Sequence, residues 1–457
     1  MAEFINRTRE LAALETWWNG GTALAMVWGR RRIGKSLLLQ EFARTRASVF
    51  HAATRQPTTL ELARLSRTVV DAGHDGGRAL TERPFQTWDE ALSHLRLVAQ
   101  ASGEPLLLVL DELPELAAAD PSLLSVLRAW ADSTGDHSPL RILLCGSAVR
   151  TMQGLAEERA PLFGRFGLSL PVHPFAPHEA ALMLSDLAPS ERAAVYGLLG
   201  GVPFYLAMWD TSAPIADNLM RLLLNPAGRL LAEGELLLAT EGDAGRMAGP
   251  VLAAIGAGRS KFSEIADAIG VDPTRIVEQL VRLRLVERLI PITEDPVRSR
   301  RRIYRLADPF MAFWFSVIDR HRSAIERGLG EQVLPVVMAS LDDILGPRFE
   351  DAFREHLHRL AADGALGDEI VAIGPAWGGE LDEVDAVVLA GRDRHPVAVG
   401  EAKWARTVNA RRIETGLIRK GAVLSPDADL RLIIAAREHV EGAASDTLTM
   451  TAADMFD

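Results

Sequence analysis

The amino-acid sequence predicts an α/β protein, and three observations indicate this class. Apolar runs of strand length at 23–28 and 106–110 are each followed by a segment with helical spacing of its apolar residues. A glycine-containing loop joins the first run to its helix. Near the C-terminus, EVDAVVLAG and PVAVGEAKW have the length and alternation of strands. With 457 residues the chain is too long for one hydrophobic core, so we expect three or four domains.

Composition predicts a cytoplasmic protein that does not enter a membrane. Hydrophobic residues make up 48% and charged residues 24% of the chain, which is ordinary for a globular protein. The longest apolar runs are too short to span a bilayer, and the N-terminus lacks a signal-peptide layout. Cys145 is the one cysteine and cannot form an internal disulfide. The net charge of -11 disfavours uniform coating of nucleic acid, but eight arginines between Arg282 and Arg305 form a local basic cluster.

The first apolar run leads into GRRRIGKS at 29–36, which fits the pattern G-x-x-x-x-G-K-[ST]. Gly29 and Gly34 let the backbone curl, so that its N–H groups converge on phosphate oxygens at a helix N-terminus. We expect Lys35 to reach the β- and γ-phosphates of ATP and Ser36 to ligate Mg²⁺. The alternative is a glycine turn with an incidental lysine, which the strand before it and the helix after it disfavour. The three arginines between the glycines are expected to be solvated or to face a partner.

The second and third apolar runs each end in residues that suit the same chemistry. The run at 106–110 is followed by Asp111, expected beside Mg²⁺, and Glu112, expected to polarise the attacking water. The run at 141–145 leads to Ser147, a candidate sensor of the γ-phosphate. A simple strand-to-helix turn at Ser147 is an equally open alternative.

Six spaced segments support a family resemblance. FINRTRELAALE, VWGRRRIGKS, LLLVLDELPEL, LLCGSAVRTM, PLFGRFG and GGVPFYL occur in the order seen in the archaeal-type, AAA-like ATPases related to STAND proteins. The resemblance covers residues 1 to about 230 and implies a P-loop core at 1–175 and a helical lid at 176–245. It implies that Pro203 contacts the base side of the nucleotide and that Arg165 is a trans-acting or sensing arginine. Without it, these are a residue in a turn and a basic residue near an edge strand.

Residues 246–328 are expected to contain a winged helix-turn-helix. Short helices are predicted at 251–255 and 261–270, with Ser263 as the cap of the second and Gly270 at its end. A third helix opens with Asp272 as its N-cap and Pro273 at the first helical position. Two strands then flank a polar loop, which completes the wing.

The third of these helices is the predicted recognition helix, with Arg275, Gln279 and Arg282 facing outward. The arginines of the wing would contact phosphates of DNA. The alternative is that the module only packs within the protein. The aromatic stretch DPFMAFWFSVIDRHR that follows is predicted to be a buried helix.

Residues 329–457 carry a second set of chemically suggestive residues. A helix at 347–360 contains Glu350, the strand EVDAVVLAG contains Asp385, and the next strand ends in Glu401-Ala402-Lys403. This pattern resembles the restriction-endonuclease-like fold with its PD-(D/E)xK signature, although the proline before Asp385 is missing.

The chemistry of such a site explains the spacing of its residues. Alternate residues of a strand share a face, so Glu401 and Lys403 point the same way and Asp385 can join them. The two carboxylates would hold Mg²⁺, Glu350 would complete the metal shell, and Lys403 would orient or deprotonate a water. His356 and His358 lie two apart on a helix, do not share a face, and are not expected to bind metal.

The sequence therefore predicts a P-loop NTPase core with a helical lid, a winged helix-turn-helix and a C-terminal restriction-endonuclease-like domain. The first functional hypothesis is an ATP-dependent DNA-binding protein that cleaves DNA with Mg²⁺ at Asp385, Glu401 and Lys403. The second is a nucleotide switch or DNA-binding regulator with an inactive C-terminal domain. A third, an ATP-driven motor, would need a ring of subunits, and a homo-oligomer is compatible with each hypothesis.

Overall fold

The computed structural model describes residues 4–134, 137–240, 247–426 and 428–457. The chain divides into two compact units, Met1–Pro174 and Phe175–Asp457, and each is described by itself. The predicted boundary at 245/246 lies outside the described residues, and the finer division of the second unit stays a prediction. Within the described ranges, no helix has the length and apolar character needed to cross a membrane.

The first unit is built around a five-stranded parallel sheet with the strand order β2-β3-β4-β1-β5. The strand β4 therefore lies between β1, which precedes the glycine loop, and β3, which ends in Asp111. Residues of β1, β3 and β4 are almost completely buried, as expected for a parallel sheet covered on both faces. The strands are β1 (Leu24–Trp28), β2 (Ser48–Ala52), β3 (Leu106–Asp111), β4 (Leu140–Gly146) and β5 (Phe166–Pro171).

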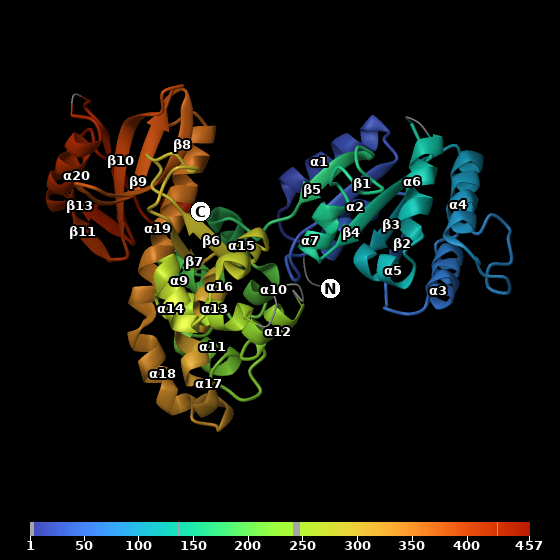
Figure 1. Ribbon diagram of the computed structural model, residues 1–457, viewed down its shortest axis with the longest axis horizontal. Helices are drawn as coiled ribbons and strands as arrows, with labels where there is room; N and C mark the ends of the chain where they lie inside the picture. Colours follow the sequence, from blue (N-terminus) through green and yellow to red (C-terminus); the bar gives the residue numbers. More distant parts are fainter. Residues whose placement is uncertain (1–3, 135–136, 241–246, 427) are drawn as a thin grey trace. The chain divides into compact units, whose positions relative to one another are not determined.

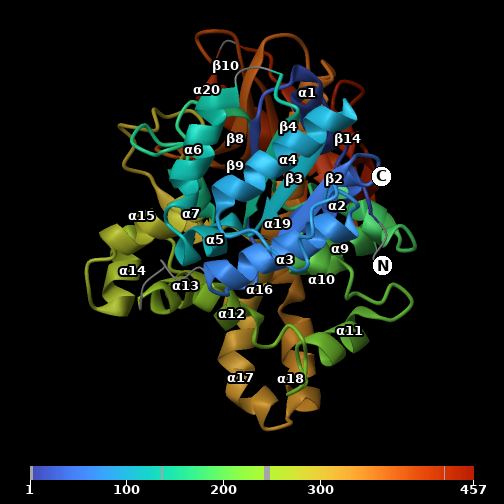
Figure 2. The ribbon, with the colours of Figure 1, turned by 90° about the vertical axis from the view of Figure 1, so that its right-hand side faces the viewer.

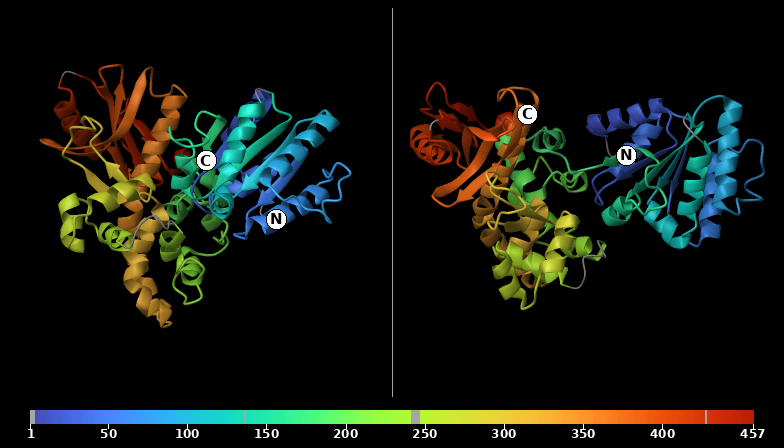
Figure 3. Two further views of the ribbon diagram at one scale, coloured as in Figure 1. Left: turned by 45° about the vertical axis from the view of Figure 1, so that its right-hand side comes forward. Right: turned by 45° about the horizontal axis from the view of Figure 1, so that its top comes forward.

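Helices cover both faces of this sheet (Figures 1 and 3). Residues of α1 and α2 share one apolar cluster with Ala25 and Val27 of β1. Residues of α3, α4 and α6 share the other with Leu24 and Met26, the alternate residues of the same strand. The helices are α1 (Thr8–Gly20), α2 (Lys35–Ala43), α3 (Thr58–Asp71), α4 (Trp88–Ser102), α5 (Leu113–Ala119), α6 (Leu123–Thr134) and α7 (Val149–Gly154).

The second unit begins with helices that share one continuous core from Phe175 to Leu345. The pair α17 and α18 projects from this core, and α19 runs from the pair toward the C-terminal sheet (Figures 1 and 2). The first helices are α8 (Pro177–Ala181), α9 (Pro189–Leu199), α10 (Pro203–Leu206), α11 (Ile215–Leu222) and α12 (Glu233–Thr240). Those before the sheet are α16 (Pro309–Phe313), a π-helical turn at Trp314–Ile318, α17 (Asp319–Glu326), α18 (Gly330–Ala339) and α19 (Leu341–Ala362).

Between these two groups lie three short helices and a two-stranded antiparallel hairpin. Gly270 ends the second helix with a φ of 71°, as predicted, because glycine adopts this left-handed conformation without strain. The predicted cap at Ser263 is wrong: the carboxylate of Glu264 accepts the backbone N–H groups of Ser260 and Lys261 instead. The elements are α13 (Ala248–Gly256), α14 (Phe262–Ile269), α15 (Thr274–Arg282), β6 (Val286–Leu289) and β7 (Ile303–Leu306).

The start of α15 was predicted one residue too early. Asp272 therefore lies one residue before the N-cap position, which Pro273 occupies, although its Oδ1 accepts the backbone N–H of Thr274 at 2.8 Å. The helix itself begins at Thr274, so Pro273 precedes it. Assignments of helix ends commonly differ by this amount.

The C-terminal part is a five-stranded sheet in the order β14-β12-β10-β9-β8. The strands β8, β9 and β10 are antiparallel, whereas β12 runs parallel to β10. The helix α19 was predicted to begin at Pro347 but starts at Leu341, because Leu341 and Leu345 are buried in the core and extend it backwards. The elements are β8 (Ile370–Gly378), β9 (Leu381–Ala390), β10 (His395–Lys403), β11 (Thr407–Asn409), α20 (Ala410–Leu424), β12 (Arg431–Ala436), β13 (His439–Glu441), β14 (Leu448–Met450) and α21 (Ala452–Phe456).

Candidate functional site

The glycine loop between β1 and α2 has the backbone shape that its sequence predicts. A Cβ at Gly29 would lie 2.4 Å from the carbonyl oxygen of Val172, so only glycine fits there. Gly34 has a φ of 86° and immediately precedes α2, whose first residue is Lys35. The loop thus turns directly into a helix N-terminus, where backbone N–H groups favour an anion.

Lys35 lies inside this loop. Its Nζ donates hydrogen bonds to the carbonyl oxygens of Gly29 at 2.8 Å and Arg30 at 2.9 Å. Burial lowers the pKa of the Lys35 ammonium, while Glu112 and Asp111 act in the opposite direction. A buried lysine that is held only by backbone carbonyls is well placed to bind a strongly anionic phosphate group.

The predicted magnesium ligands and the predicted water-activating residue meet at the carboxyl ends of β3 and β4. The hydroxyl of Ser36 donates to Oδ2 of Asp111 at 2.6 Å. Glu112 has a φ of 57°, a strained conformation for a residue with a side chain. Its Oε2 accepts hydrogen bonds from the Ser147 hydroxyl at 2.9 Å and the Ser147 N–H at 3.2 Å. Lys35, Ser36, Asp111, Glu112 and Ser147 therefore form one group.

Two arginines that the sequence analysis did not assign to this group also contact it. Nη2 of Arg7 donates to the carbonyl oxygen of Ile33 at 2.8 Å and so supports the loop from its outer side. Arg31, expected to be solvated or to face a partner, donates to the Ser147 hydroxyl at 3.3 Å. The only sequence signal for Arg7 was its place in the segment FINRTRE, which carries no loop motif.

In the second unit, the predicted C-terminal residues also come together. Nζ of Lys403 lies 3.0 Å from Oε1 of Glu401 and 3.7 Å from Oδ2 of Asp385. The backbone N–H of Ala402 donates to the same Asp385 oxygen at 2.9 Å. Lys420 of α20, a residue not predicted, contacts Oε2 of Glu401 at 3.0 Å. The cluster thus holds two carboxylates and two ammonium groups.

Burial and charge act in opposite directions on these groups. Burial raises the pKa of Asp385, and it raises the pKa of Glu350 to about 7, with the nearby charge of Asp385 as the next cause. Burial alone would also raise the pKa of Glu401, but the hydrogen bonds from Lys420 and Lys403 outweigh it and lower that pKa. Among the described side chains, no three carboxylates, imidazoles or thiolates form a group that could hold a metal ion. The three-carboxylate site stays a prediction.

Asp351, one residue after Glu350, connects this cluster to the β6–β7 hairpin. Its carboxylate pairs with Arg305 of β7 at 2.6 Å, with Arg348 at 3.1 Å and with Arg354. Arg354 in turn donates to the backbone carbonyl oxygen of Asp385 at 2.7 Å. Burial would raise the pKa of Asp351, but the three arginines outweigh it and lower the pKa. Arg348, Asp351 and Arg354 lie three residues apart on α19, a spacing that allows such pairs. The contact with Arg305 depends on the packing of β7 against α19 and has no local signal in the sequence.

A basic groove runs between α15 and the β6–β7 hairpin, and we call it the arginine groove. Of the predicted recognition residues, Arg282 lines it, whereas Arg275 and Gln279 do not. Arg282, Arg288 and Arg300 are exposed, and no side-chain hydrogen bond or ion pair is recorded for them within the described ranges. The arginines that line the groove are Arg282, Arg288, Arg298, Arg300, Arg301 and Arg302.

Two family models match parts of the chain. Residues 4–209 match the family described as "ATPase domain predominantly from Archaea". The chain carries an archaeal-type ATPase domain. Residues 314–413 match a second family, described as "Archaea bacterial proteins of unknown function". The ATPase domain includes Lys35, Asp111, Glu112 and Ser147, so the predicted nucleotide chemistry falls within a family that matches it.

Two relatives and a solved structure are similar to this chain. An uncharacterised protein of Methanocaldococcus jannaschii is 25% identical over 431 residues, which cover 93% of each chain. An uncharacterised ATP-binding protein of the same organism is 44% identical over 52 residues, which are 10% of this chain and 88% of that one. A Walker-type ATPase of Pyrococcus abyssi matches with a TM-score of 0.52 and 21% identity, over 68% of this chain and 96% of that one. This last similarity concerns the fold alone.

Two residues that the resemblance assigned to the ATPase domain remain predictions. Arg165 is half-buried and forms an ion pair with Asp132 at 2.7 Å, and its role toward a nucleotide stays a prediction. Pro203 is the first residue of α10 and lies in the second unit, as does Gly201, whose carbonyl oxygen accepts the Phe175 N–H. The histidines behave as predicted: His356 is buried and His358 is exposed, on different faces of α19.

Proposed function

We propose that the ATPase domain controls DNA binding by the second unit, and that the C-terminal cluster cleaves the DNA with a divalent metal ion. The observation that carries the cleavage proposal is the position of Lys403, whose ammonium contacts both Asp385 and Glu401. Two carboxylates that share one cation are directed at a common point. The strand order and the helices α19 and α20 support a restriction-endonuclease-like domain, and α13 to β7 support a winged helix-turn-helix.

The donor set fits Mg²⁺. This ion is usually bound in proteins through one or two carboxylates, with water and substrate phosphate as the other ligands. Asp385 and Glu401 would hold it in the C-terminal cluster, with Glu350 nearby, and Ser36 and Asp111 would hold the Mg²⁺ of ATP. A bound divalent ion would polarise the scissile phosphate and acidify a water.

The side chains of the cluster would divide the remaining work. Lys403 would exchange its contacts with the two carboxylates for a contact with the phosphate or the attacking water. Lys420 keeps one oxygen of Glu401 oriented from α20. Arg354 holds the backbone of Asp385, so that its carboxylate stays directed at Lys403. Wing arginines would hold the DNA backbone without reading its sequence.

The test is a cleavage assay with circular and linear DNA in Mg²⁺ or Mn²⁺, with and without ATP. Glu401→Gln should abolish cleavage and leave ATP binding unchanged. Lys35→Ala should change the ATP dependence of cleavage without altering the cluster. Glu438→Gln is the matched control, because this glutamate lies just before β13, outside the sheet that carries the cluster, and pairs with Arg406 at 2.6 Å instead. DNA that stays intact with the wild-type protein in every condition would contradict the cleavage proposal.

A second candidate is an ATP-dependent DNA-binding regulator whose C-terminal cluster does not cleave. The observation that favours it is that a lysine occupies each oxygen of Glu401, Lys403 on one and Lys420 on the other. This candidate predicts that nucleotide changes DNA affinity or the mass of a homo-oligomer, with no cleavage in either metal. Mass measured by light scattering with and without ATP, beside the cleavage assay, separates the two candidates.

A further inference from the structure

We infer that the arginine groove binds a single-stranded polynucleotide in preference to a duplex. This rests on the proposed nucleic-acid binding by the second unit and specifies its substrate class. The predicted mode was different: a recognition helix that enters the major groove of a duplex through Arg275, Gln279 and Arg282.

The groove is strongly cationic. Seven basic side chains line it, the six arginines and Lys261, against one acidic side chain, Glu278. The chain as a whole carries a net charge of -11, so this cationic surface is local. Arg301 pairs with Glu294 and Arg298 approaches Asp295 at 3.9 Å, which orients these two side chains. Exposed arginines without internal partners, Arg282, Arg288 and Arg300, remain for a polyanionic backbone.

Aromatic rings line the same groove. Phe262, Tyr304 and Trp377 line it together with the arginines. The side chain of Phe262 is 37% exposed, and its ring lies 6.5 Å from the ring of Tyr304. A cationic groove with aromatic side chains is the usual surface for single strands, because bases that are not paired can stack on the rings. Paired bases in a duplex are already stacked and expose no face to such rings.

The shape of the surface also differs from that of a duplex reader. A duplex reader presents a convex helix, and residues along that helix reach base edges in the major groove. Here the lining residues face one another across a cavity of about 1200 Å³, with α15 on one side and the β6–β7 connection on the other. Arg275 and Gln279, which a duplex reader would use, are absent from the lining.

The groove also reaches the C-terminal sheet. Trp377 belongs to β8, and the side chain of Arg301 lies so close to the next residue that a Cβ at Gly378 would be 2.6 Å from its Cδ. The β6–β7 connection and β8 are joined further by a backbone hydrogen bond of 2.8 Å from Ile292 to Pro375. A polynucleotide in the groove would therefore touch the C-terminal sheet at β8. The neighbouring β-strand, β9, carries Asp385.

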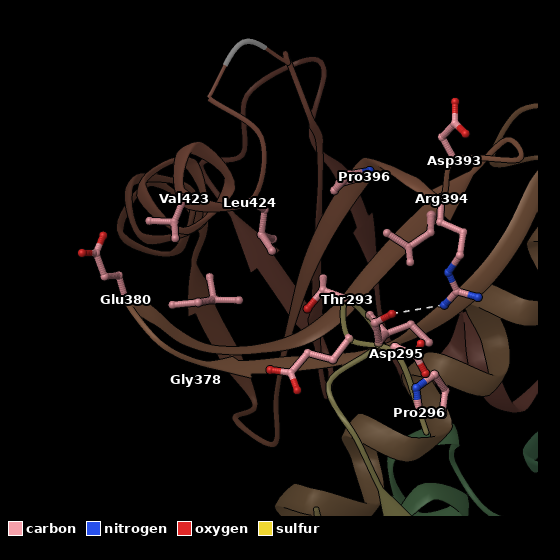
Figure 4. A pocket seen from close by; sticks show the side chains of 14 residues that line it. Thr293, Asp295, Pro296, Gly378, Glu380, Asp393, Arg394, Pro396, Val423 and Leu424 are labelled. Carbon is pink, nitrogen blue, oxygen red and sulfur yellow. Dashed lines mark hydrogen bonds between the residues drawn. The ribbon is translucent and has the colours of Figure 1, made fainter. Parts of the chain in front are cut away.

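A neighbouring pocket, lined by other residues of the same connection, does not share these properties (Figure 4). It is lined by Glu294, Asp295, Glu380 and Asp393, with Arg394 donating to the carbonyl oxygen of Ile292 at 3.1 Å. Its acidic rim would repel a phosphate backbone. A polynucleotide is thus expected in the arginine groove only.

Fluorescence anisotropy with the full chain tests the inference. The probes are a labelled DNA strand of about 16 nucleotides, its duplex with the complementary strand, and RNA of the same sequence. We expect at least about tenfold tighter binding of a single strand than of the duplex. Trp377→Leu and Phe262→Leu should each weaken it by roughly 5- to 150-fold, the range for loss of one stacking contact of about 1–3 kcal/mol. Arg300→Ala should weaken binding and reduce its salt dependence.

The controls are Arg275→Ala, an arginine of α15 that does not line the groove, and Phe163→Leu, an exposed phenylalanine of the first unit. Both should bind as the wild type does, and a melting curve for each variant shows that it is folded. Tighter binding of RNA than of DNA would support the inference and identify the sugar. Duplex binding that is as tight as single-strand binding, or that depends on Arg275, would overturn it. Failure to bind any of the three probes would contradict the proposed function itself.

Discussion

The glycine loop of the ATPase domain and the C-terminal cluster differ in how far along the chain their parts lie from one another. The loop that leads to Lys35 is a single segment of six residues, 29–34, between β1 and α2. In the C-terminal cluster, Glu350, Asp385, Glu401 and Lys420 come from four different elements: α19, β9, β10 and α20. A local motif positions the glycine loop and Lys35, whereas tertiary packing brings Asp111, Glu112 and Ser147 to them and assembles all of the C-terminal cluster.

The two sites also differ in which groups surround their charged side chains. Lys35 is held by two backbone carbonyls, and burial lowers its pKa. In the C-terminal cluster, each carboxylate is adjusted by other side chains: Glu401 by two lysines, and Asp385 by Lys403 and by Arg354. Substitutions should therefore act on chemistry in the first site and on both chemistry and stability in the second.

The largest expected effect is in the ATPase domain. Glu112→Gln keeps the hydrogen-bonding geometry near Ser147 but removes the base that would polarise water, so hydrolysis should fall by about 10²- to 10⁴-fold. Nucleotide binding should persist. Phosphate release and nucleotide affinity measure the two effects. The control is Glu115→Gln, because Glu115 lies on the following helix and pairs with Arg55 at 2.6 Å. Equal hydrolysis by Glu112→Gln and Glu115→Gln would remove Glu112 from the mechanism.

The next largest effect is expected on the stability of the second unit. Asp351→Asn leaves Arg305, Arg348 and Arg354 without their shared carboxylate. Removal of one partner from such a network should lower the free energy of unfolding by about 3–5 kcal/mol. Urea unfolding, followed by signals of the second unit, measures it, with Asp343→Asn on the same helix as the exposed control. Similar unfolding midpoints for the two variants would show that the network does not stabilise the unit.

A smaller effect concerns pH. Burial raises the pKa of Glu350 from 4.5 to about 7 in the folded protein, so the folded state holds this proton more tightly than the unfolded state does. Its contribution to stability is fully present below about pH 4.5 and is lost as pH rises through about 7. Glu350→Gln should flatten the decline of stability across this window. Melting temperatures at several pH values measure it, and Glu355→Gln, exposed on the same helix, should keep the wild-type slope.

The sequence predicted the ATPase domain in detail because its signals are local. A strand, a glycine loop and a helix in order define the backbone of the loop, and strand ends carry Asp111, Glu112 and Ser147. It also predicted that Glu401 and Lys403 share a face, since this depends only on strand alternation. The contact of Lys403 with Asp385 depends on the pairing of β9 with β10. The motif implied this pairing but did not determine it.

What the sequence did not predict depends on long-range packing. Arg7 supports the glycine loop across 26 residues, and Arg305 reaches Asp351 across 46. No periodicity or spacing connects such pairs. The early start of α19 has the same cause, since burial of Leu341 and Leu345 outweighs the preference of proline for the first turn. The arginine groove required knowing that β8 of the C-terminal sheet supplies Trp377 to a wall built by α15 and the hairpin.

The proposed function requires that nucleotide in the ATPase domain controls nucleic-acid binding by the second unit. The most direct measurement is the affinity of the full chain for a labelled single strand, with and without a nonhydrolysable ATP analogue, in the wild type and in Lys35→Ala. Coupling between two sites is typically about 1–3 kcal/mol, or 5- to 150-fold in affinity. We predict a shift of this size in the wild type and none in Lys35→Ala. The same affinity with and without the analogue in the wild-type protein would contradict the claim.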